Sequence, residues 1–150
     1  MKKGLSDDQY CFACGTLNPI GLRMEVSFHD NKAYSRLSLK REFQGWSNKA
    51  YSRLSLKREF QGWSDIVHGG VMATILDEIM AHAVLHYVGQ AVTTSLQVTY
   101  RAPLKVGEEF EAIGYVAEQK SRVAVAKAEI RTPGSKKIIA RGESKFVLLK

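Results

Sequence analysis

The chain has 150 residues, of which 45% are hydrophobic and 25% are charged. This composition is typical of one folded domain and excludes a disordered chain, and no apolar run is long enough to span a bilayer. The formal net charge is +7, but the basic residues are spread along the chain and form no nucleic-acid motif. The N-terminus lacks the apolar stretch of a secretory signal. We therefore expect a cytoplasmic protein that binds neither nucleic acid nor membranes, although a diffuse positive field suits a small polyanionic substrate.

The first motif in the chain is the C-x-x-C pair Cys11 and Cys14, in YCFACGTLNPIGL. A zinc site needs about four ligands, and no second Cys pair or nearby His pair completes the set. A redox pair is expected at a helix start in a βαβ unit, whereas the turn-forming residues GTLNPIG follow here. We interpret the two cysteines as packed thiols in an N-terminal cap and expect no metal.

A first strand is predicted in GLRMEVSFHD, and an exact repeat follows it. Residues 31–47 and 48–64 both read NKAYSRLSLKREFQGWS. Two identical copies indicate a tandem duplication within one domain that covers residues 1–150, because the repeats of solenoids drift apart and number three or more. Each copy contributes a net charge of +3, so a chain with one copy would have 133 residues and a net charge of +4.

Each copy of the repeat contains one stretch with the alternating pattern of a half-buried strand, AYSRLSLK. The two copies compete for one position in the sheet with identical side chains. We expect one copy to occupy that position and the other to form an excursion at the sheet edge, and the sequence does not decide which.

A long helix is predicted from about Gly70 to Val88, closed by Gly89. Four strands are predicted after it, in residues 91–103, 108–119, 122–132 and 136–149, with turn-forming segments between them. A single helix that is apolar nearly all round must be enclosed by a sheet. The predicted fold class is therefore α+β, with an antiparallel sheet wrapped around a long central helix.

Two acids, Asp77 and Glu78, lie in the middle of this apolar helix. At 100° per residue, Glu78 falls on one line with Thr74, His82 and His86, and Asp77 lies beside that line. Such a line is typical of a polar face that is turned to solvent or to a partner chain.

The helix is preceded by His68 and opens on Gly69 and Gly70. Glycine lets the backbone approach a ligand closely, and the first N–H groups of a helix lack intrahelical partners and carry the positive end of its dipole. They can hold a carbonyl oxygen that becomes negative during attack, while an acid such as Asp77 activates water or attacks directly.

Gly69 and Asp77 are separated by about 12 Å along one helix, so they cannot both touch one carbonyl carbon. Two antiparallel helices related by a two-fold axis would bring Gly69 of one chain to Asp77 of the other. The sequence thus predicts a homodimer with two composite sites.

Three strings, CFACGTLNPIGL, FQGWSDIVHGGVMATILDE and TTSLQVTYRAPLKVGE, resemble the hotdog-fold acyl-CoA thioesterases of the PaaI-like branch. The resemblance covers almost the whole chain apart from the extra 17 residues. It implies the hotdog fold, dimers that often pair into tetramers, and cleavage of acyl-CoA to a free acid and CoA, with no cofactor beyond the CoA of the substrate.

Position by position, the resemblance implies that Asp77 is the catalytic carboxylate, as general base or nucleophile, and that Gly69 is the backbone donor to the thioester carbonyl. It assigns His68 to the border of the site and Thr93 to the hydroxyl that positions water or the carboxylate. Without the resemblance, Thr93 is equally well explained as an ordinary strand threonine. Some relatives carry an Asn six residues before the His, where this chain has Gly62.

The substrate-binding residues are expected to include Gly70 and four cations for the CoA phosphates: Arg101, Lys105, Lys120 and Arg122. Long basic side chains near turns are free to reach phosphates, but solvated hairpin charges explain each of them equally well.

Other functions stay open. A non-catalytic acyl-CoA-binding or sensing protein on the same fold would lack a functional acid, so Asp77 favours the enzyme. A hotdog dehydratase or hydratase would place a His–Asp or His–Glu pair at the bond that changes, and the spacing from HGG to Asp77 disfavours it. The acyl group of the substrate is not determined by the sequence.

Overall fold

The computed structural model describes residues 9–29 and 49–150. In chain order the elements are β1 (Ser27–His29), β2 (Lys49–Ser55), a short 3-10 helix η1 (Arg58–Phe60), α1 (Gly69–Tyr87), β3 (Ala91–Tyr100), β4 (Glu109–Lys120), β5 (Val123–Arg131) and β6 (Ile138–Leu148). The predicted order of two strands, one long helix and four strands is confirmed. In the described part of the chain, no helix is long and apolar enough to cross a membrane.

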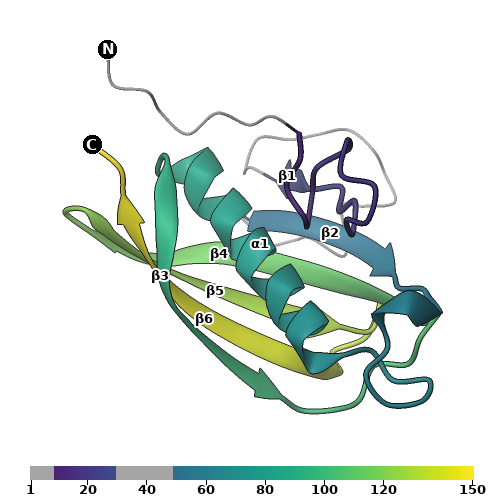
Figure 1. The fold of residues 1–150 in the computed structure, drawn as a ribbon. Helices are drawn as coiled ribbons and strands as arrows, with labels where there is room; N and C mark the ends of the chain where they lie inside the picture. Colours follow the sequence, from purple (N-terminus) through teal and green to yellow (C-terminus); the bar gives the residue numbers. More distant parts are fainter. Residues whose placement is uncertain (1–8, 30–48) are drawn as a thin grey trace.

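All six strands belong to one sheet with the order β1-β2-β4-β5-β6-β3, and each strand is antiparallel to its neighbours. The helix α1 lies across one face of the sheet, which curves around it (Figure 1). This arrangement confirms the expected α+β hotdog architecture. Strand β3 follows α1 directly in the chain but lies at the sheet edge opposite β1.

The core lies between α1 and the middle strands of the sheet. The helix buries one face there, and the strands meet it with small side chains, because alternate residues of β5 from Ala124 to Ala128 are alanines that are at most 1% exposed. At Gly114 of β4, an added Cβ would lie 2.6 Å from the carbonyl oxygen of Ile79. The helix therefore rests directly on the backbone of the sheet. Its buried residues are Met72, Ile75, Leu76, Ile79, Met80, Ala83 and Val84.

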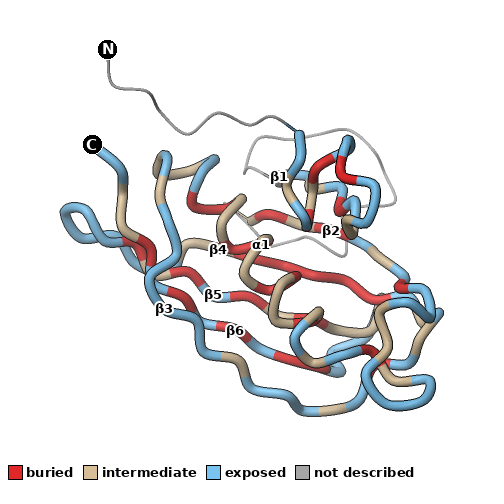
Figure 2. Tube along the Cα trace, in the orientation of Figure 1, coloured by how far each residue is buried: buried red, intermediate tan, exposed pale blue. Residues whose placement is uncertain are grey.

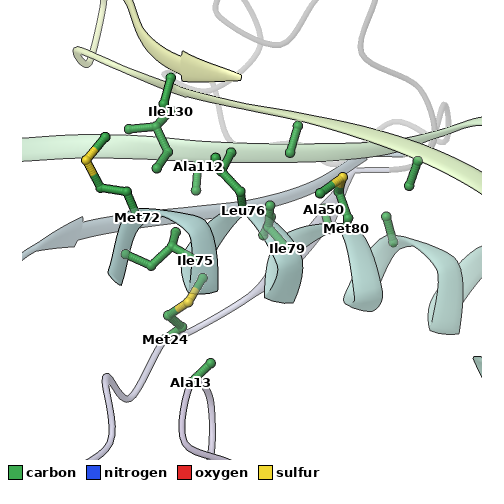
Figure 3. Close-up of a cluster of buried hydrophobic side chains, with 14 of the residues drawn as sticks. Ala13, Met24, Ala50, Met72, Ile75, Leu76, Ile79, Met80, Ala112 and Ile130 are labelled. Atoms are coloured by element: carbon green, nitrogen blue, oxygen red, sulfur yellow. The ribbon is translucent and has the colours of Figure 1, made fainter. Parts of the chain in front are cut away.

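The side of α1 that faces away from the sheet is covered by the N-terminal segment, residues 9–26. Ala13 and Met24 are both 3% exposed, and they lie on the opposite side of α1 from Ala112 and Ile130 (Figure 3). Burying a side chain of the size of Met contributes roughly 1.5–3 kcal/mol. The helix is thus enclosed from two sides.

The first strand is shorter than predicted. A strand was expected within residues 21–30, but only Ser27–His29 pairs with β2. The residues before it bond to the N-terminal segment instead: the N–H of Leu22 donates to the carbonyl of Phe12, and that of Met24 to Ala13. These bonds take the place of sheet pairing. The helix begins at Gly69 and ends at Tyr87, each one residue earlier than predicted.

The second copy of the repeat supplies β2 and the connection to the helix. The N–H of His68 donates to the carbonyl of Phe60 at 2.9 Å, and the N–H of Gly62 to that of Ile66 at 2.8 Å. These contacts tie the end of the second copy to the start of α1. The first copy, and with it the expected excursion, lies outside the described residues.

The outer face of the sheet, away from α1, carries paired charges. Glu111 of β4 is 1% exposed and bridges Arg53 of β2 at 2.8 Å and Arg131 of β5 at 3.1 Å. Farther along, Arg141 pairs with Glu129 at 3.2 Å. Three of the basic residues, Arg53, Arg131 and Arg141, are therefore paired with acids within the sheet.

Candidate active site

The start of α1 presents a free backbone donor. His68 is the N-cap, and its Nδ1 accepts from the N–H of Gly70 at 2.9 Å. The proton of the neutral imidazole then lies on Nε2, which can donate. The N–H groups of Val71 and Met72 both donate to the carbonyl of His68. Among the described residues, the N–H of Gly69 has no acceptor, so it is the donor that remains for a ligand.

Gly69 is held from the opposite side by Tyr100, the last residue of β3. The Tyr100 hydroxyl donates to the Gly69 carbonyl at 2.6 Å, and a Cβ at position 69 would lie 3.3 Å from that hydroxyl. Tyr100 was not among the predicted site residues. It lies in the TTSLQVTYRAPLKVGE string, but no spacing rule links residues 31 positions apart.

The side chain of Asp77 extends from α1 to β3. The Thr93 hydroxyl donates to Asp77 Oδ1 at 2.9 Å. The register of β3 shifts between Thr93 and Ser95, and such bulges re-aim side chains next to functional sites. Burial raises the pKa of Asp77, and the nearby charge of Glu78 adds to the rise, while the Thr93 hydrogen bond opposes it. A carboxylate with a raised pKa is a stronger base.

Glu78, the neighbouring acid, lies on the other side of the helix, against the N-terminal segment. Its Oε1 is 3.1 Å from His82 Nε2 and accepts from the Cys11 thiol at 3.5 Å. Burial raises the pKa of Glu78, but hydrogen bonds from His82 and Cys14 outweigh it, so the net pKa is lowered. The pKa values of the two adjacent acids are therefore shifted in opposite directions, which indicates different roles for them.

The polar line on α1 is typical of a face that is turned to solvent or to a partner chain, and in this structure part of it contacts the chain's own N-terminal residues and β1. Glu78 is covered by the N-terminal segment, and the ring of Phe28 stacks on His86 with centroids 3.9 Å apart. The reason is tertiary: the loop before β1 folds back over the helix, which the sequence pattern of the helix alone does not reveal.

The residues that could hold a metal lie in this covered region, not beside Asp77. Cys11 and Cys14 are free cysteines at half-buried positions, as expected for packed thiols. Burial raises the pKa of the Cys14 thiol, and hydrogen bonds to Glu78 and Cys11 raise it further. In the absence of a metal the Cys14 thiol is thus protonated and unreactive at neutral pH.

The four predicted cations do not gather within one chain. Arg101 and Lys105 follow β3 at the end of the molecule where α1 begins, since Lys105 bridges Ile66. Lys120 and Arg122 flank the turn between β4 and β5, at the opposite end of α1, as Figure 1 shows. Lys120 pairs with Glu118 at 2.9 Å, and Arg122 donates to the carbonyl of Leu148 at 3.1 Å. All four side chains are exposed.

Gly62 lies directly against His68. A Cβ at position 62 would be 3.2 Å from the His68 Cα and 3.4 Å from its Cδ2. This is the position at which the resemblance places an Asn, and in this chain any side chain there would press against His68.

A hollow among the described residues lies elsewhere. It has a volume of about 450 Å³ and lies on the outer face of the sheet, lined by side chains that include Gln97, Lys127 and Arg141. That face is turned away from α1, so this hollow is separate from Asp77 and Gly69. Strand β3 is exposed along most of its length, as Figure 2 shows.

The fold agrees with the comparisons with known proteins. Residues 65–139 match the model of the family described as the thioesterase superfamily. The chain belongs to this superfamily. The matched half of the chain runs from the loop before His68 to β6 and includes all four predicted catalytic residues.

Curated relatives include acyl-coenzyme A thioesterase 13 from Mus musculus and from Homo sapiens. Each is 30% identical over 78 residues, which cover 51% of this chain and 56% of the relative. The match thus spans little more than half the length of these relatives.

Among solved structures, a thioesterase superfamily protein aligns with a TM-score of 0.76 and 21% identity, over 93% of this chain and 60% of its own. A mutant of the phenylacetic acid degradation protein PaaI from Thermus thermophilus aligns with a TM-score of 0.63 and 24% identity, over 68% of this chain and 86% of its own. These similarities support the fold.

Proposed function

We propose that this protein is an acyl-CoA thioesterase that hydrolyses a thioester to a free acid and CoA. The observation that carries the proposal is the contact between Thr93 and Asp77 Oδ1 at 2.9 Å, which fixes a half-buried carboxylate and leaves its second oxygen unused. Membership of the thioesterase superfamily and the names of the curated relatives support the same reaction.

The reaction centre is shared between two copies of the chain. Strand β3 has ten residues, none of them charged, and eight are exposed. It pairs only with β6 among the described strands, and a long uncharged edge strand invites pairing with another chain. Antiparallel pairing of two β3 strands about a two-fold axis would place the two α1 helices side by side. Gly69 of each chain would then face Asp77 of its mate. Further pairing of dimers into tetramers stays a prediction.

In the proposed reaction, the thioester carbonyl oxygen accepts the N–H of Gly69 from one chain. Asp77 Oδ2 of the other chain takes a proton from water, and the hydroxide attacks the carbonyl carbon. The tetrahedral intermediate places its negative oxygen on the Gly69 amide. The C–S bond then breaks, and the CoA sulfur takes the proton from Asp77. Direct attack by Asp77, followed by hydrolysis of the resulting anhydride, gives the same products.

The dimer would also gather the predicted cations. Because the two helices are antiparallel, the start of one lies near the end of the other. Arg101 and Lys105 of one chain would then approach Lys120 and Arg122 of its mate, where all four can neutralise the phosphates of CoA.

The first test measures thiol release from a panel of acyl-CoA thioesters. Asp77→Asn is expected to lose at least about a hundredfold in kcat, as for removal of a catalytic base. Thr93→Val should lose less, since it removes only the hydrogen bond to Oδ1, and Thr99→Val on the outer face serves as its control. Turnover that is unchanged in Asp77→Asn would reject the assignment. If the native chain binds acyl-CoA but does not hydrolyse it, the alternative of a non-catalytic acyl-CoA-binding or sensing protein would be favoured.

The second test distinguishes the effect of losing the Gly69 N–H from the effect of adding side-chain volume at this position. Gly69→Pro removes the N–H, and proline is well accepted at the first position of a helix. His68 has φ −61° and ψ 131°, which suits the residue before a proline. Gly69→Ala adds a Cβ but keeps the N–H, so it is the matched control. The proline variant is expected to lose at least about a hundredfold in kcat, and the alanine variant much less.

A mixture of the two inactive variants tests whether each site is shared. After subunit exchange, a dimer of one Gly69→Pro chain and one Asp77→Asn chain contains one intact site. Half of the dimers in an equal mixture are mixed, so about a quarter of the native activity should return. No recovery in a mixture that has demonstrably exchanged would contradict a site that takes Gly69 from one chain and Asp77 from the other.

A further inference from the structure

A second cluster of reactive side chains lies outside the proposed reaction centre. One ligand atom from each of Cys11, Cys14 and Glu78 lies within 4.8 Å of the others. The cysteines come from the N-terminal segment and the carboxylate from the middle of α1, 67 positions away. All three residues are half-buried.

The backbone turn between the cysteines holds their two sulfur atoms close together. The N–H of Gly15 donates to the carbonyl of Cys11 at 2.9 Å, and the N–H of Cys14 lies 3.5 Å from Cys11 Sγ. A Cβ at Gly15 would lie 2.5 Å from both the Cys11 nitrogen and the Gln9 carbonyl oxygen. Only glycine fits there, so the tightness of the turn depends on it. An N–H directed at the sulfur also stabilises a thiolate that binds a metal.

The carboxylate is oriented toward the thiols by its own neighbour. Glu78 Oε1 is 3.5 Å from Cys11 Sγ and 3.1 Å from His82 Nε2. A metal-binding carboxylate is usually held by such an outer hydrogen bond, which fixes its direction. His82 lies one helical turn after Glu78, so this support comes from the same rigid element.

The spacing of the donor atoms suits a small divalent metal. A tetrahedral zinc ion with Zn–S bonds of about 2.3 Å and Zn–O bonds of about 2.1 Å places neighbouring ligand atoms about 3.5–3.8 Å apart. The Cys11–Glu78 distance already has this value, and a movement of the sulfurs by at most about 1 Å brings the rest into range. Two thiolates and one carboxylate favour zinc over magnesium or calcium, which prefer oxygen ligands alone.

We propose that Cys11, Cys14 and Glu78 bind one zinc ion that fastens the N-terminal segment to α1, with water as the fourth ligand and His82 as a positioning residue. Binding replaces the proton of each thiol, so two protons are released for each zinc bound. Because the site lies against the N-terminal segment and not beside Thr93, the ion would take no part in the proposed hydrolysis.

The proposal is tested with the full-length reduced chain after removal of metals by a chelator. Titration with Co²⁺ should produce thiolate-to-cobalt charge-transfer absorption that saturates at one equivalent per chain, and Zn²⁺ should displace the cobalt. The variant Cys11→Ser with Cys14→Ser should lose both signals. Glu78→Gln should weaken zinc binding at least about tenfold, measured against a chromophoric chelator. Glu59→Gln, an exposed acid of η1, is the matched control and should bind as the native chain does.

A second measurement uses the native chain alone, in case a variant fails to fold. One equivalent of zinc should protect both thiols from a disulfide reagent and raise the melting temperature, and neither readout involves acyl-CoA. Absence of stoichiometric uptake by the reduced native chain, or uptake that persists in the folded double-serine variant, would overturn the proposal.

Discussion

At the scale of single residues, the main feature is that two adjacent acids have different environments. Asp77 contacts Thr93 of β3, and Glu78 contacts Cys11 of the N-terminal segment. Successive residues of a helix are 100° apart, so these two adjacent side chains enter different environments. The sequence alone marks both as unusual in an apolar helix, but only their neighbours tell a base from a structural acid.

The raised pKa of Asp77 predicts that its charged form lowers the stability of the folded protein, a cost that the proposed catalytic role explains. A carboxyl whose pKa is higher in the folded than in the unfolded state favours folding when protonated. That contribution is complete below the unfolded pKa and is lost as the pH rises through the folded pKa. At neutral pH the charged form therefore opposes folding. Asp77→Asn should melt at a higher temperature than the native chain at pH 7, and the difference should vanish near pH 3, where both forms are uncharged.

Thermal melts of the two proteins across this pH range check the prediction. The pH profile of kcat/KM gives an independent measure, because its acidic limb should lie above the ordinary pKa of an aspartate. A lower melting temperature for Asp77→Asn at neutral pH would show that the charge is stabilised in the folded dimer.

At the scale of elements, the position of α1 on the sheet depends on glycine and alanine in the strands. Gly114 of β4 meets the carbonyl oxygen of Ile79, whereas Gly142 of β6 meets the end of the Met80 side chain, with a Cβ-to-Cε distance of 3.1 Å. Backbone atoms of a helix cannot yield locally, but a methionine methyl group can move. Two glycines on the same face of the sheet are therefore expected to respond differently to the same change.

Gly114→Ala should destabilise the protein by about 2–3 kcal/mol, since the added methyl group pushes the helix away from the sheet. Gly142→Ala should cost under about 1 kcal/mol, because Met80 can adjust. Urea denaturation of both variants measures the difference. Equal costs would mean that the approach of helix and sheet backbones does not limit the packing.

At the scale of the whole molecule, the duplicated segment is inserted into a hairpin. His29 of β1 pairs with Lys49 of β2, and residues 30–48 connect them. Removal of either copy gives the same 133-residue chain, in which only an Asp-Asn dipeptide would join the two strands. Two-residue hairpin loops favour residues such as Asp and Asn, which tolerate the left-handed backbone region. The hairpin register thus fits the shorter chain.

The single-copy chain is expected to be more stable than the duplicated one by about 1–2 kcal/mol, because a shorter connection between two strands costs less closure entropy, by about 0.6 kcal/mol for each halving of its length. Chemical denaturation of the two proteins tests this, with thioester hydrolysis as a check that the fold is kept. Unfolding of the single-copy chain would show that the first copy is needed, which contradicts the expectation of a dispensable excursion.

The sequence by itself determined the order and type of the elements and the antiparallel sheet around one helix. Those features follow from local patterns, such as the alternation along β5 and the HGG start of α1, which neighbours in the chain specify together. The resemblance added the assignment of Asp77 and Thr93, which the structure places 2.9 Å apart.

Only the tertiary structure decided which residues from distant segments meet. It brought Tyr100 to Gly69, Glu78 to Cys11, and the second copy of the repeat to the sheet. None of these has a local signal: the first two contacts depend on the path of the whole chain. The two copies have identical side chains, so what separates them is that the second leads directly into the bonds that hold the start of α1.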